Sequence, residues 1–346
     1  MTRVTRSTIP RLELSRSQIL AFRRRVGALD ERLPPGAKSL RQAAWAGLQD
    51  SMPRAALLSI HARVAGADSA VWEHQSLVQI WGPRFSDYVV PAKDLAVFSL
   101  GRLPENARGQ ARALDTAARL RAFLDGRRMP FGEAGRGMGV SPNSLRYAAA
   151  TGTVLLRWDG VRQPVVRCAP PPEMDPREAR LELARRYLHV FGPATAASFA
   201  RWAGIGRVEA SGAFDMLART LTPVRTAAGE AWILAEDEAE FLRAPSKPSL
   251  GARFLPSGDA YYLLWGTDRE ILVPDAKRRA ELWTERVWPG ALLVDGEIVG
   301  VWRRAGADLS IQTGRRLSKA EWDAVEAEAM SLPLRGLKEK IDVRRS

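Results

Sequence analysis

The spacing of apolar residues in the middle of the chain predicts short helices followed by paired strands. NARGQARALDTAARLRAFLDG has apolar residues at helical spacing, and PFGEAGRGMG follows it as a short second helix. SPNSLRYAAATG predicts a third helix, with Ser141 as N-cap, Pro142 in the first helical position and Gly152 at its end. The β-rich runs of TVLLRWDGVRQPVVRC surround Asp159-Gly160, so a hairpin is expected there.

The same order recurs on both sides of this segment. DPREARLELARRYLHVFG, PATAASFARWAG and IGRVEASGAFDMLART predict helices before the hairpin LTPVRTAAGEAWIL. Nearer the N-terminus, SQILAFRRRVGAL, PPGAKSLRQAAWAGL and SMPRAALLSIHARV predict helices before LVQIWGPRFSDYVV, whose strands surround Gly82-Pro83. Three helices followed by a hairpin is the order of a winged helix. The repeat of roughly 70–90 residues is longer than solenoid repeats, so we expect tandem small domains.

The pattern changes after residue 248. Short β-type segments separated by turn residues such as Asp295-Gly296 follow, namely RFLPSGDAYYLLWG, REILVP, ALLVDGEIVGVWRR and DLSIQTG. SKAEWDAVEAEAMSL predicts a closing helix. We therefore expect an α+β protein, with winged-helix domains at residues 1–104, 105–172 and 173–248 and a mostly β domain at residues 249–346.

The charge of the 346-residue chain adds a functional expectation. The net charge is +13, and residues 1–40 and 101–170 carry +6 and +7 of it. Such concentration is expected for a protein that binds a polyanion, and arginine, which supplies 45 of the 52 basic residues, suits contacts to phosphate. A GC-rich genome that encodes arginine by default would give the same composition.

Several other classes of protein are disfavoured. No apolar run approaches the ~20 residues of a bilayer span, and the N-terminal MTRVTRSTIPRLELSRSQIL lacks the apolar stretch of a signal peptide, so we expect a cytoplasmic, nucleoid-associated protein. A single cysteine, Cys168, excludes an intramolecular disulfide. Three scattered histidines disfavour a metal site, and we expect structural roles for His61, His74 and His189. No phosphate-binding loop or hydrolase motif is present, so no cofactor is expected.

Some polar side chains fall where a winged helix contacts DNA. Asn143, Ser144 and Arg146 begin the third helix of the middle domain, from which recognition helices present side chains to bases. The remaining candidates lie on or beside predicted hairpins and are Arg84, Arg157, Arg162, Arg303 and Arg304. Ordinary caps and solvent-exposed surface residues would look the same.

The best polar cluster for catalysis is Gln49-Asp50-Ser51, at the joint between two predicted helices. Asp50 or Ser51 could simply cap the second helix. An amide beside a carboxylate could also hold a water molecule, which suffices for a reaction whose leaving group is already activated.

These segments resemble the bacterial winged-helix DNA-binding proteins related to AlkZ and YcaQ. The similarity spans residues 15–335 and is carried by AGLQDSMPRAALLSIHARV, WGPRFSDYVVPAKDLAVFSLGRLP, SPNSLRYAAATGTVLLRWDG, ELARRYLHVFGPATAASFARWAGI, RFLPSGDAYYLLWGTDREILVP and RVWPGALLVDGEIVGVWRR. The resemblance implies three tandem winged helices and a C-terminal β unit. It also implies a monofunctional DNA glycosylase that excises N-alkylated purines from double-stranded DNA, in some members from interstrand cross-links, without metal or cofactor.

The family's catalytic motif, Gln-x-Gln or Gln-x-Asp, falls at Gly47-Leu48-Gln49-Asp50. If Gln49 is the last residue of this three-residue motif, its first residue is Gly47. If Gln49 is the first residue of the motif, its last residue is Ser51. Neither register completes the motif, and the resemblance implies Gln49 and Asp50 as the catalytic residues.

The implied chemistry makes modest demands on the protein. Alkylation at N7 or N3 makes the purine a cationic leaving group, so the enzyme has to stabilise an oxocarbenium-like sugar and place a water molecule. Two alternatives stay open: a non-catalytic winged-helix DNA-binding protein, such as a regulator or resistance protein, and winged helices used for protein contacts. No obvious dimer helix is present, which favours a monomer around one duplex.

Overall fold

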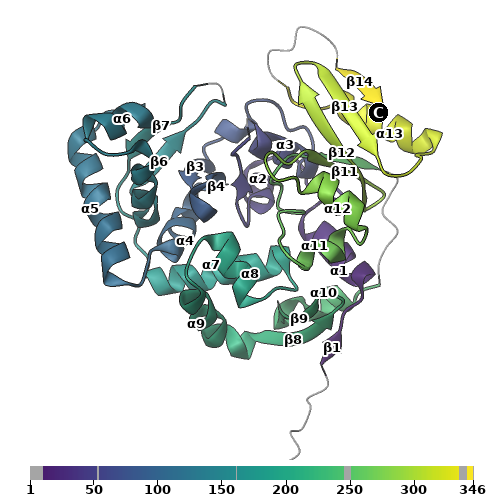
Figure 1. Ribbon diagram of the computed structural model, residues 1–346, viewed down its shortest axis with the longest axis horizontal. Helices are drawn as coiled ribbons and strands as arrows, with labels where there is room; N and C mark the ends of the chain where they lie inside the picture. Colours follow the sequence, from purple (N-terminus) through teal and green to yellow (C-terminus); the bar gives the residue numbers. More distant parts are fainter. Residues whose placement is uncertain (1–10, 53, 161, 245–250, 335–340, 346) are drawn as a thin grey trace, which may run out of the picture.

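The computed structural model describes residues 11–52, 54–160, 162–244, 251–334 and 341–345, and along them helices precede a hairpin three times (Figure 1). The first set contains α1 (Arg16–Val26), α2 (Ala37–Ala43), α3 (Ala55–Arg63), β3 (Leu77–Trp81) and β4 (Asp87–Pro91). The second contains α5 (Ala107–Leu124), α6 (Phe131–Gly137), the 3₁₀ helix η5 (Pro142–Thr151), β6 (Val154–Arg157) and β7 (Val165–Cys168). The third contains α7 (Pro176–Phe191), α8 (Ala196–Ala203), α9 (Arg207–Leu217), β8 (Leu221–Thr226) and β9 (Gly229–Leu234).

Local signals explain several helix ends. The side chains of Asn106 and Asp175 accept backbone N–H groups at the starts of α5 and α7. Gly152 ends η5 with φ +74°, as predicted. The predicted N-cap is wrong, because the Ser141 side chain makes no capping bond and the helix is 3₁₀ rather than α. In a 3₁₀ helix the first-turn N–H groups are oriented differently from those of the α-helix for which the cap was expected.

The strands join helix–hairpin sets that the sequence pattern separates. β3 pairs with β6 through Gln79 and Leu156, which gives a six-stranded sheet in the order β2-β4-β3-β6-β7-β5, where β2 is Leu48–Gln49 and β5 is Met129–Pro130. The strand β1 (Leu12–Glu13) pairs in parallel with β8 of the third set. Such pairings depend on tertiary packing rather than on local pattern.

The helix α1 also belongs by its contacts to the third set. The Phe22 ring of α1 lies 6.1 Å, between ring centroids, from His189 of α7, and it stacks on Phe241 of α10 (Glu238–Leu242), the helix after the third hairpin, at 3.7 Å. The sequence pattern instead grouped this helix with residues 1–104. The domain limits stay predictions, and the expected boundary at residues 248 and 249 lies outside the described residues.

The C-terminal part forms a five-stranded sheet of β10 (Ala252–Leu255), β11 (Gly290–Val294), β12 (Glu297–Ala305), β13 (Asp308–Thr313) and β14 (Asp342–Arg345), with α13 (Lys319–Met330). The predicted turn is confirmed, because Asp295 and Gly296 have φ +50° and +81°, as a tight hairpin requires. The expected strand REILVP is wrong. Residues 269–272 of this run belong to α11 (Asp268–Leu272), and α12 (Ala276–Leu282) follows. Such a short apolar run does not distinguish helix from strand.

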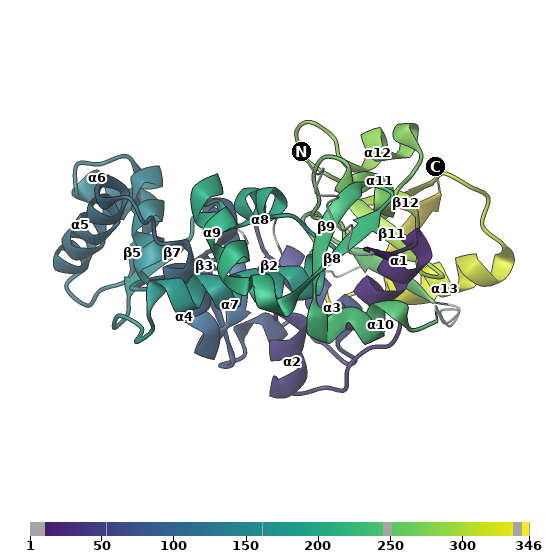
Figure 2. The same ribbon diagram turned by 90° about the horizontal axis from the view of Figure 1, so that it is seen from below.

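The molecule is elongated, with α5 and α6 at one end and the C-terminal sheet and α13 at the other (Figure 2). A continuous apolar core joins the first hairpin, α7–α9 and the segment before β11; its largest members include Tyr88, Phe98, Tyr187, Trp202, Tyr262 and Trp283. Within the described ranges, every helix is too short or too polar to cross a membrane. Parts of the chain far apart in sequence therefore meet at the middle of the molecule, beside α3 and its preceding joint.

Candidate active site

A pocket of about 320 Å³ lies at this meeting point. The joint before α3, the turn of the first hairpin and the C-terminal segment all contribute to its wall. The lining residues are Gln49, Ser51, Met52, Arg84, Ser86, Ser257, Gly258, Leu263, Trp265, Arg286, Val287 and Trp288.

The backbone of the joint separates Gln49 and Ser51 from Asp50. Gln49 pairs with Tyr88 across β2 and β4, and the next N–H, that of Asp50, donates to the Asp87 carbonyl at 2.7 Å. Alternate side chains of an extended segment point to opposite sides. Gln49 and Ser51 accordingly line the pocket, whereas Asp50 is 4% exposed and is absent from the lining.

The amide of Gln49 is held at both ends. Its Oε1 accepts a hydrogen bond from Arg84 Nη2 at 2.8 Å, and its Nε2 donates to Ser51 Oγ at 3.2 Å. Because an amide offers distinct donor and acceptor ends, these two partners fix its orientation. Gly258 approaches the amide closely: it has φ +80°, and a Cβ there would lie 3.1 Å from Gln49 Cδ. A side chain at this position would be strained and would press on Gln49.

Arg84 lies against the pocket, although the sequence suggested a wing tip. The residue has φ +55°, and its guanidinium carbon lies 4.7 Å from the ring centroid of Trp265. The end of α8 packs on this turn, since a Cβ on Gly204 would lie 2.9 Å from the backbone nitrogen of Arg84. Arg84 thus joins Gln49 to an aromatic side chain of the C-terminal segment.

A buried ion pair positions the turn that carries Gly258. Asp259 is 1% exposed and accepts from Arg63 Nη1 and Nη2, each at 2.7 Å, and from Ser59 Oγ at 2.6 Å. Arg63 and Ser59 belong to α3, so the pair connects this helix to the C-terminal segment. Two parallel charge-assisted bonds set the geometry of the contact as well as its strength.

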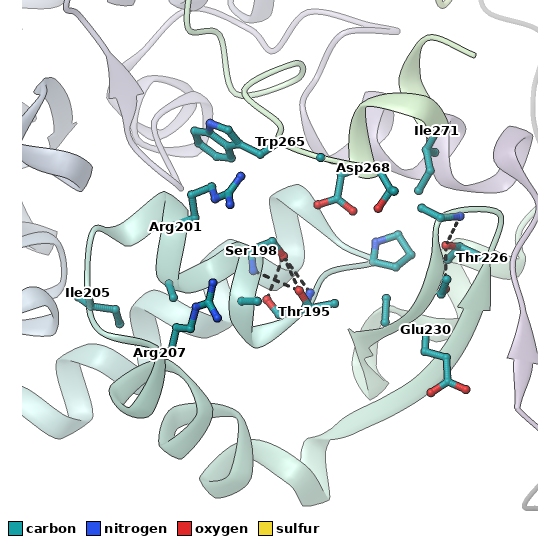
Figure 3. Close-up of a pocket in the computed structure, with 18 residues that line it drawn as sticks. Thr195, Ser198, Arg201, Ile205, Arg207, Thr226, Glu230, Trp265, Asp268 and Ile271 are labelled. Carbon is teal, nitrogen blue, oxygen red and sulfur yellow. Dashed lines mark hydrogen bonds between the residues drawn. The ribbon is translucent and has the colours of Figure 1, made fainter. Parts of the chain in front are cut away.

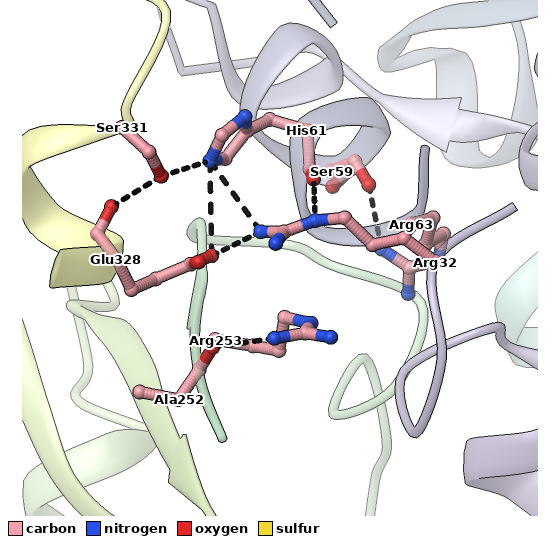
Figure 4. A network of polar contacts seen from close by, with 8 residues as sticks. All are labelled: Arg32, Ser59, His61, Arg63, Ala252, Arg253, Glu328 and Ser331. Atoms are coloured by element: carbon pink, nitrogen blue, oxygen red, sulfur yellow. Dashed lines mark hydrogen bonds and ion pairs between the residues drawn. The ribbon is translucent and has the colours of Figure 1, made fainter. Parts of the chain in front are cut away.

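A second network connects α3 to α13 (Figure 4). Arg32 donates to Glu328, and His61 Nε2 lies 3.1 Å from Ser331 Oγ and 3.7 Å from Glu328 Oε1. Burial lowers the pKa of His61, with Glu328 opposing this and Arg32 adding to it. The histidine therefore packs as a neutral ring in the junction between helices, away from the Gln49 pocket lining.

Asp50 makes a specific contact of its own. Its Oδ1 accepts the N–H of Ala56 at 2.9 Å, in the first turn of α3. Burial raises the pKa of Asp50 to about 7, while the Ala56 bond and Arg54 lower it and Asp87 raises it further. Burial likewise raises the pKa of Asp87 to about 6, and Arg146 lowers it. Near neutral pH the Asp50 carboxyl is thus close to its protonation midpoint.

The other residues predicted to contact DNA are spread over the molecule. Asn143 and Arg162 are exposed and Ser144 is half-buried. Half-buried Arg146 donates to the Phe85 carbonyl, exposed Arg157 pairs with Glu73, and exposed Arg303 and Arg304 donate to the carbonyls of Val287 and Gly306. The structure places Gln49 and Arg84 together, with Arg146 reaching the residue after Arg84.

Sequence reasoning did not single out the C-terminal lining of the pocket. Ser257, Gly258, Trp265, Arg286 and Trp288 come from segments more than 200 residues after Gln49. The only local signal was the turn chemistry of Ser-Gly-Asp, which predicts a turn but not its neighbour.

Comparison with known proteins identifies the family of the chain. The AlkZ-like family, described as "DNA glycosylase AlkZ-like", matches residues 43–333, which include every residue of the pocket lining. The chain belongs to the AlkZ-like DNA glycosylase family. The resemblance stated from the sequence segments is therefore confirmed.

Two relatives of the AlkZ-like chain come from Streptomyces sahachiroi. An interstrand DNA cross-link repair glycosylase is 31% identical over 162 residues, a match that spans 45% of this chain and 42% of that protein. The solved structure of the DNA glycosylase AlkZ aligns with a TM-score of 0.74 over 97% of this chain and 100% of that one, at 19% identity. The structural likeness establishes a shared fold.

Proposed function

We propose that the chain is a DNA glycosylase that hydrolyses the N-glycosidic bond of alkylated purines in double-stranded DNA, including purines in interstrand cross-links. The observation that carries this proposal is the Gln49 amide, fixed by Arg84 and Ser51 in a pocket of an AlkZ-like chain. The relative named for interstrand cross-link repair supports the cross-linked substrates.

In this proposal Gln49 and Ser51 place the attacking water molecule. Gln49 Oε1 and Ser51 Oγ each keep acceptor capacity after bonding to Arg84 and to the Gln49 amide. A water that donates to these oxygens presents a lone pair to the sugar as the cationic purine departs. Attack forms the new C–O bond, the electrons of the broken C–N bond leave with the purine, and the water proton passes to solvent. Weak basicity is sufficient because the leaving group is already charged.

The motif register that fits this role has Gln49 first and Ser51 third. The two side chains share the pocket wall, whereas Gly47 has no side chain to contribute. We assign Asp50 a positioning role: its hydrogen bond to Ala56 holds the joint before α3, and Asp50 affects the rate only by keeping Gln49 and Ser51 in place. This division follows from the alternation of side chains along the extended backbone.

The proposal includes a DNA-binding architecture. We infer that the helix–hairpin sets are tandem winged helices and that a monomer binds one duplex. The exposed Arg157, Arg162, Arg303 and Arg304 stay the proposed phosphate contacts, since arginine side chains bind phosphate without reading sequence. Asn143, Ser144 and Arg146 stay the proposed contacts at the start of the third helix of the middle set. A cytoplasmic, nucleoid-associated location follows from a DNA substrate.

The test is incubation of the purified protein with three duplexes, scored for abasic sites. The duplexes are unmodified DNA, DNA containing N7-methylguanine, and DNA cross-linked between strands at guanine N7. We expect abasic sites in the second and third duplexes only. DNA binding without base release from either lesion would instead support the non-catalytic DNA-binding alternative.

A further inference from the structure

A second cavity, of about 410 Å³, also has Trp265 in its wall (Figure 3). It is lined by α8, the start of α9, the turn of the third hairpin and side chains from residues 265–271. Trp265 lines both this cavity and the Gln49 pocket. The Arg84 guanidinium, which donates to Gln49, lies over the Trp265 ring. The two cavities are therefore neighbours that share an aromatic wall.

The charges around the second cavity are divided between its two sides. Arg201, Arg207 and Trp265 lie on one side in Figure 3, and Asp268 and Glu230 lie on the other. Arg201 and Arg207 are exposed, and neither side chain has a hydrogen bond or ion pair within the described part of the chain. The cationic side is the one that includes the wall shared with the Gln49 pocket.

Several arginines around this cavity have no ion pair among the described residues. Arg286 lines the Gln49 pocket and is also without an ion pair among the described residues. The guanidinium of the half-buried Arg269 lies over the rings of Trp283 and Trp288. Burial is the main cause that lowers the pKa of Arg269, and repulsion from Arg201 lowers it further. Many other arginines of the protein pair with carboxylates, as Arg16 does with Glu297. An anion bound between such arginines would relieve their mutual repulsion.

We propose that this cavity is a phosphodiester subsite for the DNA strand whose damaged nucleotide occupies the Gln49 pocket. Arg201 and Arg207 bind the backbone phosphate next to the target nucleotide, and Trp265 separates the two subsites. The placement of the target nucleotide rests on the proposed function; the phosphate contact itself does not. Asp268 and Glu230 would repel phosphate, so the strand passes along the arginine side.

The first arm of the test measures salt dependence of binding. Arg201→Ala combined with Arg207→Ala should reduce the magnitude of the slope of log K against log salt by about 0.9, the loss of one phosphate contact. The matched control combines Arg177→Ala and Arg219→Ala, two exposed arginines away from the cavity lining that also lack side-chain partners in the described ranges. The control removes the same charge and should change the slope by less than half as much.

The second arm locates the phosphate. Duplexes carry a tetrahydrofuran abasic analogue, and a neutral methylphosphonate replaces one linkage at a time around it. Replacing one linkage adjacent to the analogue should lower the DNA affinity of wild type at least about fivefold. The same replacement should leave the affinity of the double variant unchanged. Equal losses in both proteins, or a double variant that binds like wild type, would overturn the subsite.

The two proposals fail in different ways. A protein that releases no base but shows the linkage-specific loss keeps the phosphate subsite and loses the glycosylase proposal. A protein that releases alkylpurines at equal rates with and without Arg201 and Arg207, and shows no linkage-specific loss, keeps the glycosylase proposal and loses the subsite.

Discussion

The first and second hairpins carry similar sequence signals but present their turns to different surroundings. Arg84 in the first turn is half-buried between Gln49 and Trp265. Arg162 in the second turn is exposed, and Arg157 at its base pairs with Glu73 across an exposed surface. Glycine, proline and aspartate determine that a chain reverses, whereas packing of α8 and the C-terminal segment determines what the turn touches. An arginine at a hairpin turn can thus line either an internal pocket or an exposed surface.

The strongest test of this contrast is Arg84→Ala. Loss of Arg84 leaves the Gln49 amide without the partner at its Oε1 and removes the cation on Trp265. We expect the single-turnover rate of alkylpurine release to fall at least about thirtyfold, or about 2 kcal/mol of barrier. Arg162→Ala should leave this rate within about twofold. Equal effects of the two substitutions on rate would break the distinction between the hairpins.

A smaller effect is expected at the turn facing Gln49. Gly258→Ala adds a Cβ about 3.1 Å from Gln49 Cδ at a backbone with φ +80°, and should reduce release about tenfold. Gly306→Ala is the matched control, because Gly306 has φ +61° and open space around the added Cβ. Melting temperatures should fall similarly in both variants, while only Gly258→Ala slows release. A similar loss of rate in both would assign the effect to stability.

Asp50→Asn separates capping from chemistry. The folded-state pKa of Asp50 is raised to about 7 from 3.8, so its stabilising contribution is present below about pH 4 and lost as pH rises through 7. Asparagine keeps the acceptor for Ala56 without the buried charge. The difference in melting temperature, variant minus wild type, should therefore be larger at pH 8 than at pH 5 by about 2 °C or more.

The rate of the same variant tests the positioning role. Asp50→Asn should release alkylpurine within about threefold of wild type at pH 6, where the wild-type carboxyl is mostly protonated. A tenfold or greater loss at that pH would make Asp50 a catalytic residue, as the family resemblance implies.

The smallest effect belongs to the second hairpin. Arg157→Ala combined with Arg162→Ala should weaken binding to damaged and undamaged duplexes by a similar factor, about threefold each, because phosphate contacts do not read the base. Titrations by fluorescence anisotropy at one salt concentration measure this. A folded double variant with unchanged affinity would remove this hairpin from the DNA-binding surface.

Local features of the fold were largely predictable, and long-range features were not. Apolar spacing indicated α5 and α7, the run SKAEWDAVEAEAMSL indicated α13, and turn residues indicated the hairpin at Asp295-Gly296, because these signals act over a few residues. The pairing of β3 with β6 and the packing of α1 on α10 have no local signature. The short run at residues 269–274 was predicted as a strand because its length and pattern suited both states.

The candidate site divides in the same way. Gln49 was predicted from a polar cluster at a helix joint, but its partner Arg84 was expected at a surface. Gly258 and Trp265 reach the pocket only because the Arg63–Asp259 ion pair and the shared core bring the C-terminal segment onto α3. No spacing along the chain encodes a contact between residues so far apart.

The central claim is that Gln49 acts on the glycosidic bond. Its most direct test is single-turnover release of N7-methylguanine from a duplex by wild type, Gln49→Ala and the control Gln110→Ala, which alters an exposed glutamine of α5. We predict release by wild type and the control at equal rates and at least tenfold slower release by Gln49→Ala, about 1.4 kcal/mol of barrier, with DNA affinity little changed. Full release by a folded Gln49→Ala protein would contradict the account.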